Sequence, residues 1–288
     1  MTVRLCLLLE QRYRDHSLPT ALADRLRHRG HHVDIVAPGA QLLDLADLIT
    51  SGNHDAWILK TVAGGPGLGL LEAAAHAGLT TINDARAIRG VRDKARAHLL
   101  ARHHQLPVPP TWAATDAATF ATVPAHHFPL VVKPADGSDG HFVHLVNGPE
   151  DLDNLRTHHT SENLLLGQPY IPNRGVDLKV YAINGRLFGT ERSSPLSTHT
   201  TVDRPVPLTA EISDLAHRVG DIYGLDLYGI DIVMGPDGPT IVDINDFPSF
   251  RHVPDSLDLL ADACLSLAWN GTRRNPLDPS HHHARTPL

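Results

Sequence analysis

The sequence predicts a protein of mixed α/β and α+β class. Up to about residue 90, short apolar runs alternate with helix-like segments, a pattern typical of a parallel sheet with helices on its faces. From about residue 105 onward, apolar runs are joined by tight turns and the helices stand apart from them, which indicates antiparallel sheets. We therefore expect a small parallel α/β lobe over residues 1–88, followed by an α+β remainder.

Composition narrows the class of protein. The 288 residues are enough for two or three hydrophobic cores, and an apolar share of 42% is usual for a soluble globular protein. The net charge of -7 argues against a nucleic-acid partner. Apolar runs are strand-length, well short of the roughly 20 residues of a membrane span, so we expect no membrane partner. Cys6 and Cys264 lie in apolar surroundings, which suits a reducing, cytoplasmic location.

Strands and helices should alternate in the first lobe. Gly30 and Gly78 stand where helices should end, because glycine readily adopts the left-handed conformation found there. We expect strands at residues 3–9, 32–38, 55–62 and 79–83, and helices at residues 19–29 and 67–78.

Residues 89–165 should form a central lobe. A basic helix is expected over residues 92–104, and "PVPPTW" should leave it as an extended segment, because proline cannot continue a helix. The stretch "LVVKPADGSDGHFVHLV" at 130–146 predicts a strand, a glycine loop and a second strand. A further helix should begin within residues 148–158.

Residues 166–275 should form a C-terminal lobe of hairpins and helices, entered through the apolar strand "NLLLGQPYI". Asn184–Gly185 is a strong hairpin signal between two strands, and Thr209 should cap a helix over residues 208–224. We also expect a second hairpin at residues 228–250, a last helix at 256–269 and a flexible tail at 276–288.

The first chemical motif is a lysine followed by a glycine loop. Lys133 ends an apolar strand, and the loop after it carries Asp136, Gly137, Ser138 and Gly140. Backbone N–H groups exposed in such a loop can bind phosphate, while the lysine supplies positive charge. A polar turn between two strands is the alternative. The motif is not the GxxxxGK[ST] phosphate loop, because here the lysine precedes the glycines.

The second motif is the strand "DLKVYAI". Alternation places Asp177, Lys179 and Tyr181 on one face, and Arg192 lies on the returning strand. If Lys179 and Arg192 converge, they can stabilise negative charge on a phosphate or a transition state. An edge hairpin with a solvated charged face is the alternative.

The third motif is the hairpin "YGIDIVMGPDGPTIVDIN". Asp243 and Asn245 share a face, and Asp231 can reach that face from the partner strand. Carboxylates inside a strand cost free energy unless something pairs with them. Two carboxylates and an amide oxygen suit Mg²⁺ held together with nucleotide phosphates. Local capping by Asp243, with a turn at Asn245, is the alternative.

Five motifs in this order resemble the ATP-grasp family. They are "RDKARAHLL", "LVVKP" with its glycine loop, "LGQPYI", "DLKVYAING" and "GIDI…VDIN", and they extend over about residues 85–270. The resemblance implies an ATP-grasp fold, in which two lobes hold ATP between two small sheets, behind an N-terminal parallel α/β lobe. It also implies Mg²⁺ as the metal, for which Mn²⁺ could substitute.

The resemblance implies a role for each matching residue. Lys94 and Lys133 look like phosphate-contacting lysines, and the loop from Asp136 to Gly140 looks like a mobile phosphate cover. Pro169 departs from the acidic residue often found in the family, and Asp243 departs from the usual Glu. The remaining matches are Gln168, Tyr170 and Ile171 at the adenine, Asp177 and Lys179 at the ribose and phosphates, and Asp231, Asp243 and Asn245 at Mg²⁺.

Two branches of the family are similar to this chain. The α/β lobe, the helix with Lys94 and "LPVPPTW" resemble the glutamate-ligase-like branch that extends peptides or modifies a ribosomal protein. That branch implies a carboxylate–amine ligase acting through an acyl phosphate on an amino acid, peptide or similar small molecule. "VDINDFPSF" and "LKVYAINGRLFGTERSSPL" also resemble the inositol-phosphate kinase branch, which implies phosphoryl transfer to a hydroxyl. A net acidic chain argues against a polyphosphate substrate.

For either reaction, Arg192 is the expected catalytic cation, assisted by Lys179. A binding module that keeps the fold without chemistry is a third alternative. The paired acids disfavour this alternative, because a site without catalytic activity does not need carboxylates whose charge must be neutralised. The sequence does not identify the acceptor, and a homodimer would be merely the commonest closed assembly.

Overall fold

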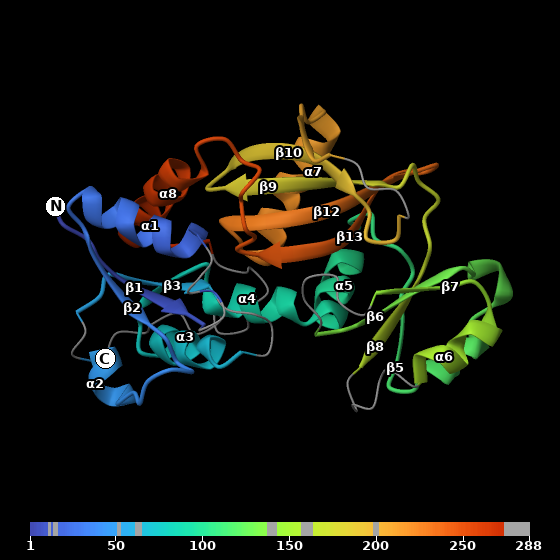
Figure 1. Cartoon of the computed structure of the whole chain (residues 1–288), viewed down its shortest axis with the longest axis horizontal. Coiled ribbons are helices and arrows are strands. Elements are labelled where there is room, and N and C mark those ends of the chain that lie inside the picture. The colour runs from blue at the N-terminus through green and yellow to red at the C-terminus, as the bar shows by residue number, and fades with distance from the viewer. Residues whose placement is uncertain are drawn as a thin grey trace, which may run out of the picture.

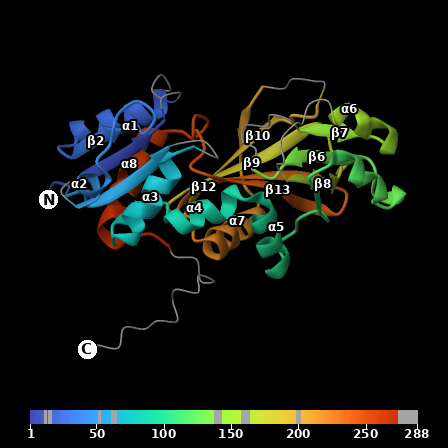
Figure 2. The same ribbon diagram turned by 90° about the horizontal axis from the view of Figure 1, so that it is seen from below.

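Three β-sheets organise the chain (Figure 1). The computed structural model describes residues 1–10, 13, 17–50, 53–60, 65–136, 143–156, 164–197 and 202–273. An N-terminal sheet lies at one end of the molecule, a middle sheet lies at the other, and a C-terminal sheet reaches from one toward the other (Figures 1 and 2). The predicted tail at 276–288 lies outside the described residues.

The N-terminal sheet is parallel, with strand order β2-β1-β3-β4, as predicted. Strand β1 is buried on both faces, because Leu5 and Leu7 pack with helices α1 and α8 while Cys6 and Leu8 pack with α3. This explains its unbroken apolar run. The elements are β1 (Arg4–Leu9), α1 (Ser17–His28), β2 (His32–Val36), α2 (Leu45–Thr50), β3 (Ala56–Lys60), α3 (Gly67–His76), β4 (Thr80–Ile82) and α8 (Ser256–Asn270). The short helix α2 was not among the predicted elements.

Two helices, α4 (Ala85–Arg92) and α5 (Lys94–His103), lead toward the middle sheet (Figure 2). The helix predicted over residues 92–104 corresponds to α5, which begins two residues later, and α4 was not among the predicted elements. Asp93 divides the region because its backbone is extended and its side chain accepts a hydrogen bond from the Arg96 N–H at 3.0 Å. Lys94 consequently stands at an elbow, on the first turn of α5.

The middle sheet is antiparallel, with strand order β5-β8-β6-β7. Its strands are β5 (Trp112–Ala114), β6 (Leu130–Pro134), β7 (His144–Val146) and β8 (Leu165–Pro169). The short helices around it are η2 (Ala117–Thr122), η3 (Ala125–His127), η4 (Pro149–Asp151) and α6 (Leu152–Arg156). The predicted lobe boundary at 165 falls inside β8 and the one at 88 falls inside α4, and the domain division itself stays a prediction.

The C-terminal sheet is antiparallel, with strand order β11-β10-β9-β12-β13, and α7 covers one of its faces. The hairpin turn at Asn184–Gly185 is confirmed, with φ of 46° and 85°. Thr209 caps α7 as predicted, accepting a hydrogen bond from the Ile212 N–H at 3.3 Å. The elements are β9 (Val176–Ile183), β10 (Arg186–Ser193), β11 (Arg204–Val206), α7 (Ala210–Tyr223), β12 (Leu227–Gly235) and β13 (Gly238–Asp246).

The N-terminal and C-terminal sheets are joined by a common core. One hydrophobic cluster combines β1, α1 and α8 with Tyr181 and Phe250 of the C-terminal part. Fully buried Asn83 adds polar contacts, since its Oδ1 accepts from the N–H groups of Asp226 and Leu227, both at 2.8 Å. The middle sheet packs instead around a cluster of its own, which includes Phe120, Leu130, Val132 and Leu165.

None of the helices in the described ranges is both long enough and apolar enough to cross a bilayer.

Candidate active site

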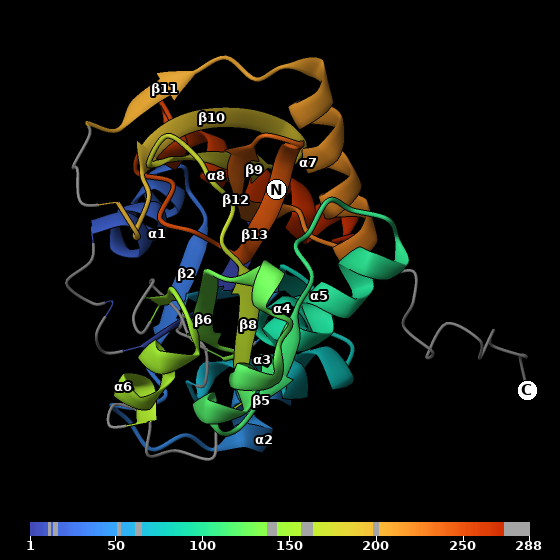
Figure 3. The ribbon, with the colours of Figure 1, turned by 90° about the vertical axis from the view of Figure 1, so that its right-hand side faces the viewer.

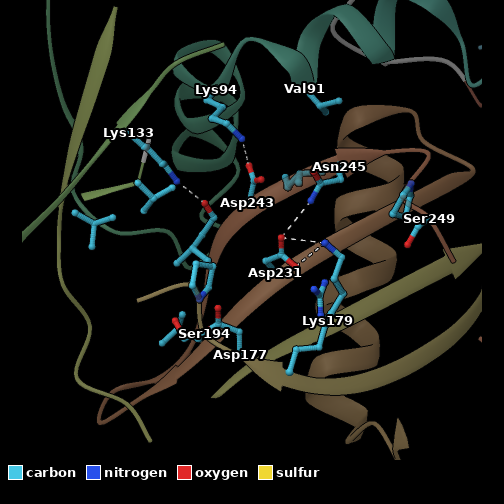
Figure 4. A pocket seen from close by; sticks show the side chains of 18 of the residues that line it. Val91, Lys94, Lys133, Asp177, Lys179, Ser194, Asp231, Asp243, Asn245 and Ser249 are labelled. Carbon is cyan, nitrogen blue, oxygen red and sulfur yellow. Dashed lines mark hydrogen bonds and ion pairs between the residues drawn. The ribbon is translucent and has the colours of Figure 1, made fainter. Parts of the chain in front are cut away.

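A cavity of about 860 Å³ opens where the three sheets meet. Figure 3 shows the middle sheet facing the viewer with the C-terminal sheet above it, and Figure 4 shows the side chains that line the cavity between them. Most of the predicted site residues line it: Lys94, Lys133, Gln168, Tyr170, Ile171, Asp177, Lys179, Arg192, Asp231, Asp243 and Asn245.

One wall of the cavity is acidic, and a β-bulge shapes it. Asp231 lies opposite Asp243, and the register then shifts so that Val242 is the extra residue of β13. The bulge changes the alternation of the strand: Ile241 packs into the core beneath α7, while Asp243 and Asn245 face the cavity. Without the bulge, Ile241 and Asp243 would share a face. This irregularity therefore lets one strand serve both a core and a polar wall.

Two lysines approach the acidic wall from outside the C-terminal sheet (Figure 4). Lys94, at the start of α5, forms an ion pair with Asp243. Lys133, at the end of β6, donates to the carbonyl oxygen of the bulged Val242 at 2.8 Å. The backbone N–H of Lys94 also donates to the Ala135 carbonyl at 3.0 Å, so the two lysines lie at one junction.

A third lysine comes from the C-terminal sheet itself. Lys179 on β9 contacts both carboxylate oxygens of Asp231, at 2.8 and 3.1 Å, and Asn245 Nδ2 donates to the same carboxylate at 3.2 Å. Gly229 leaves room for the lysine stem, because a Cβ there would lie 3.3 Å from Lys179 Cε and 3.1 Å from Pro248 Cγ. The predicted juxtaposition of Asp231 with Asn245 is thus present.

Burial and neighbouring charges set the protonation states of these groups. Burial lowers the pKa of Lys133 to about 8. Burial pushes the pKa of Asp243 upward, but the ammonium groups of Lys94 and Lys133 outweigh it and the net pKa is lowered. Burial likewise works against the charge on Lys179, yet the carboxylate of Asp231 raises its pKa overall. At neutral pH the wall therefore consists of charged pairs.

Asp177 and Arg192 lie further along the same wall, opposite each other on β9 and β10. Burial, and then the charge of Asp231, raise the pKa of Asp177 to about 6. Its Oδ1 is buried without a hydrogen-bond partner among the residues that the structure describes. Arg192 Nε lies 3.4 Å from Asp203 Oδ2. Lys179 and Arg192 therefore line one cavity, as expected, and each also faces a carboxylate.

The end of β8 supplies the residues expected near adenine. Gln168 is 7% exposed, and its Nε2 donates to Thr111 Oγ1 at 2.8 Å. The N–H of Tyr170 donates to the Pro129 carbonyl at 2.7 Å, so that amide is already used within the protein. Ile171 follows at the cavity edge.

Most of the predicted glycine loop lies outside the residues that the structure describes. Asp136 is exposed and does not line the cavity. Gly137, Ser138 and Gly140 lie outside the described residues, so their proposed contact with phosphate stays a prediction.

The acidic wall fits a divalent cation that is shared with phosphates. In the described ranges, no three His, Cys, Asp or Glu side chains gather into a complete metal cage. Asp231, Asp243 and Asn245 instead present two carboxylates and an amide oxygen on one face, which are hard oxygen ligands of the kind Mg²⁺ prefers. Such an open set leaves coordination positions for phosphate oxygens and water.

Some cavity residues escaped the sequence analysis. Arg92 pairs with Asp246 through Nε–Oδ1 and Nη2–Oδ2, both at 3.0 Å, and a sequence separation of 154 leaves no local pattern that would predict the pair. Lys60 of β3 donates to the Phe247 carbonyl at 2.7 Å and brings the N-terminal sheet to the cavity. Gly229 could have been found, because a glycine inside a strand often marks a close approach.

Comparison with known proteins gives a family match. A model described as a RimK-like ATP-grasp domain matches residues 91–263. A protein named "Probable alpha-L-glutamate ligase" from Rhodopirellula baltica is 24% identical over 188 residues, which are 62% of this chain and 46% of that protein. One of the same name from Aeromonas salmonicida is 27% identical over 184 residues, which are 60% and 61% of the two chains. The chain thus spans about half to three fifths of these relatives.

Solved structures share the fold. The RimK domain protein ATP-grasp from Sphaerobacter thermophilus gives a TM-score of 0.72 at 23% identity, covering 91% of this chain and 100% of that one. The ATP-grasp ligase PsnB, complexed with a minimal precursor, Mg and ADP, gives a TM-score of 0.68 at 19% identity, covering 92% and 97%. The predicted ATP-grasp fold is confirmed.

Proposed function

The chain belongs to the RimK-like ATP-grasp family, and from that premise we propose that it is an ATP- and Mg²⁺-dependent ligase. It would join a carboxylate to an amine through an acyl phosphate. The named relatives are glutamate ligases, which makes glutamate the first amine to test. The acceptor would be a small molecule or a peptide with an accessible carboxylate.

One observation carries the proposal. The ammonium groups of Lys94, Lys133 and Lys179 come from three separate elements and meet at a wall that holds Asp231 and Asp243. A lone metal ion would need the carboxylates but not the lysines. A polyphosphate with its divalent cation needs both, because lysines contact phosphate oxygens while carboxylates hold the metal.

Each group would then have a defined task. Bound Mg²⁺ would neutralise phosphate oxygens, and Asp231, Asp243 and Asn245 would hold it. Lys94 and Lys133 would exchange their present partners, a carboxylate and a carbonyl, for phosphate oxygens. Lys94 would thus exchange one anionic oxygen for another, whereas Lys133 would gain an ion pair in place of a hydrogen bond to a neutral carbonyl.

Asp177 and Arg192, which are neighbours on β9 and β10, would act beside the phosphates. The buried Oδ1 of Asp177 is an acceptor suited to a ribose hydroxyl. Arg192 would stabilise the negative charge that develops at the reacting carboxylate when the amine attacks the acyl phosphate. Lys179 would assist, held in place by Asp231.

Trapping with hydroxylamine tests the proposal. Incubation of the full chain with ATP, Mg²⁺, short acidic peptides as the carboxylate, and hydroxylamine in place of the amine should yield a hydroxamate together with ADP and phosphate. Arg192→Ala should abolish this product. Arg204→Ala is the matched control. Arg204 of β11 pairs with Glu191 of β10, and neither residue lines the cavity.

Two outcomes contradict the ligase. A stable phosphorylated product without hydroxamate would identify a kinase that transfers the γ-phosphoryl group to a hydroxyl. Binding of nucleotide without its consumption, over the whole panel of carboxylates, would identify a binding module.

A further inference from the structure

Two arginines of α4, one turn apart, make similar contacts in different surroundings. Arg89 pairs with Glu72 of α3 at 2.8 and 2.6 Å, and the side chains are 53% and 26% exposed. Arg92 pairs with Asp246 of β13 at 3.0 Å twice, and the side chains are only 11% and 9% exposed. The first pair joins two surface helices. The second lies in the wall of the cavity.

The position of the buried pair in the chain is informative. Arg92 precedes the elbow at Asp93 and lies two residues before Lys94. Asp246 directly follows Asn245 at the end of β13. The pair therefore connects the start of α5, which carries Lys94, to the end of β13, which carries the proposed metal ligands Asp243 and Asn245.

Stability alone does not explain a pair in this place. Removing two charges from water costs several kcal/mol per ion, and apolar pairs of similar size are often as stable or more so. A two-point contact between a guanidinium and a carboxylate fixes the separation and the relative angle of two elements, which apolar contacts do less strictly.

We propose that the Arg92–Asp246 pair is a positioning device for the nucleotide site. It sets how far the Lys94 ammonium stands from Asp243 and Asn245, so that lysine and metal-binding side chains engage the same Mg·ATP. Arg92 and Asp246 act through these groups. The inference rests on the proposed nucleotide site, and its tests separate the two.

The first test compares variants of the pair with a matched control. Arg92→Lys keeps the charge but loses one contact, and the double variant Arg92→Gln/Asp246→Asn keeps the size but loses both charges. Both should raise the KM for Mg·ATP, by about tenfold in the double variant, and raise the Mg²⁺ concentration for half-maximal rate. Arg89→Gln removes a similar pair from the same helix and should leave both quantities within twofold of wild type.

The second test asks whether the pair acts through Lys94. Binding of Mg·AMP-PNP, followed by calorimetry, gives a readout that does not depend on turnover. Asp246→Asn should weaken this binding in the wild-type background, and it should change it less than twofold in a Lys94→Ala background. Equal effects in both backgrounds would overturn the proposal, because a residue that acts independently of Lys94 does not position it.

A purely structural role is distinguishable from positioning. It would lower the melting temperature of the double variant while leaving the KM for Mg·ATP and the Mg²⁺ requirement unchanged, and that result would also overturn the proposal. Failure of the wild-type chain to bind Mg·AMP-PNP would instead contradict the proposed function itself, and with it the inference that rests on it.

Discussion

The middle sheet and the C-terminal sheet face each other across the cavity, but they are anchored differently. The C-terminal sheet shares hydrophobic clusters with the N-terminal sheet through α8, and with α4 and α5 through α7. The middle sheet packs on its own cluster around Phe120 and Leu130. The acidic wall thus belongs to the joined body, meaning the N-terminal and C-terminal sheets with their shared cores. Lys133 belongs to the middle unit, meaning the middle sheet and the short helices around it, which has a separate core.

The difference means that the site depends on a few contacts between the two units. Lys133 Nζ reaches the Val242 carbonyl at 2.8 Å, and the Lys94 N–H of α5 donates to the carbonyl of Ala135, just after β6, at 3.0 Å. The first of these contacts falls at the β-bulge. A small change in the angle between the units would therefore alter the lysine–phosphate geometry before it disturbed either core.

The largest effect is expected on turnover, from substitutions of the charged and polar side chains that face each other across the cavity. Asp243→Ala with Asn245→Ala removes groups from the joined body, and Lys133→Ala removes one from the middle unit. Each should lower Mg·ATP turnover by on the order of 10³-fold, because preorganised charges at phosphates contribute roughly that much. Circular dichroism should show an unchanged fold. Unchanged turnover in the double variant would contradict the metal assignment.

Core substitutions sharpen the comparison through stability. Phe120 and Phe250 are both almost fully buried, one in the middle core and one in the shared core. Changing either to Ala should lower the free energy of unfolding by about 3–5 kcal/mol. Hydrogen exchange should show the loss of protection confined to β5–β8 for Phe120→Ala, and spread over α1, α8 and β9 for Phe250→Ala. A global loss in both variants would mean that the units unfold together.

The next effect concerns the junction of the N-terminal and C-terminal sheets. Asn83→Ala leaves the buried N–H groups of Asp226 and Leu227 without their acceptor, so we expect a loss of roughly 2–3 kcal/mol. Asn147→Ala is the control, because Asn147 is exposed and its side-chain amide donates to the nearby Asp151 Oδ2 at 3.1 Å. Chemical denaturation measures both, and equal effects would contradict a special role for Asn83.

The smallest predicted effect is a pH dependence that originates in the middle unit. Lys133 is charged below its pKa of about 8, so kcat/KM for Mg·ATP should fall up to tenfold per pH unit as the pH rises above that value. Stability should change in the opposite direction. Because the folded pKa lies below the ordinary 10.5, raising the pH from 8 toward 10.5 removes the penalty for burying the charge. Lys133→Arg should move the alkaline limb upward, since arginine stays protonated.

Local patterns predicted much of this fold. The turn at Asn184–Gly185, the cap at Thr209 and the shared face of Asp243 and Asn245 all depend on residues close together in the sequence. Helix α4 was not predicted, although Asp84 gives it a local N-cap signal, and the predicted helix over 92–104 began two residues before α5 does. Strand β11 was missed because three residues give no period to detect.

The rest depends on contacts between distant segments. The bulge at Val242 is set by its pairing with β12 and by the neighbouring Pro107, and the sequence of β13 alone shows only an apolar run with two polar residues. The partners of Arg92 and Lys94 lie about 150 residues away. Some roles, such as adenine contact for Gln168 and Tyr170, came from the family resemblance alone, and they stay predictions.

The separate core of the middle sheet has a consequence for how the protein can change over generations. Substitutions in clusters without shared contacts add their effects nearly independently, whereas neighbours compensate one another. Sequence drift around Phe120 therefore needs no matching change around Phe250. Selection should act jointly on the few residues that join the two units, such as Lys94, Lys133 and Val242. A lineage could thus replace the interior of the middle unit while it keeps these residues, and with them the site.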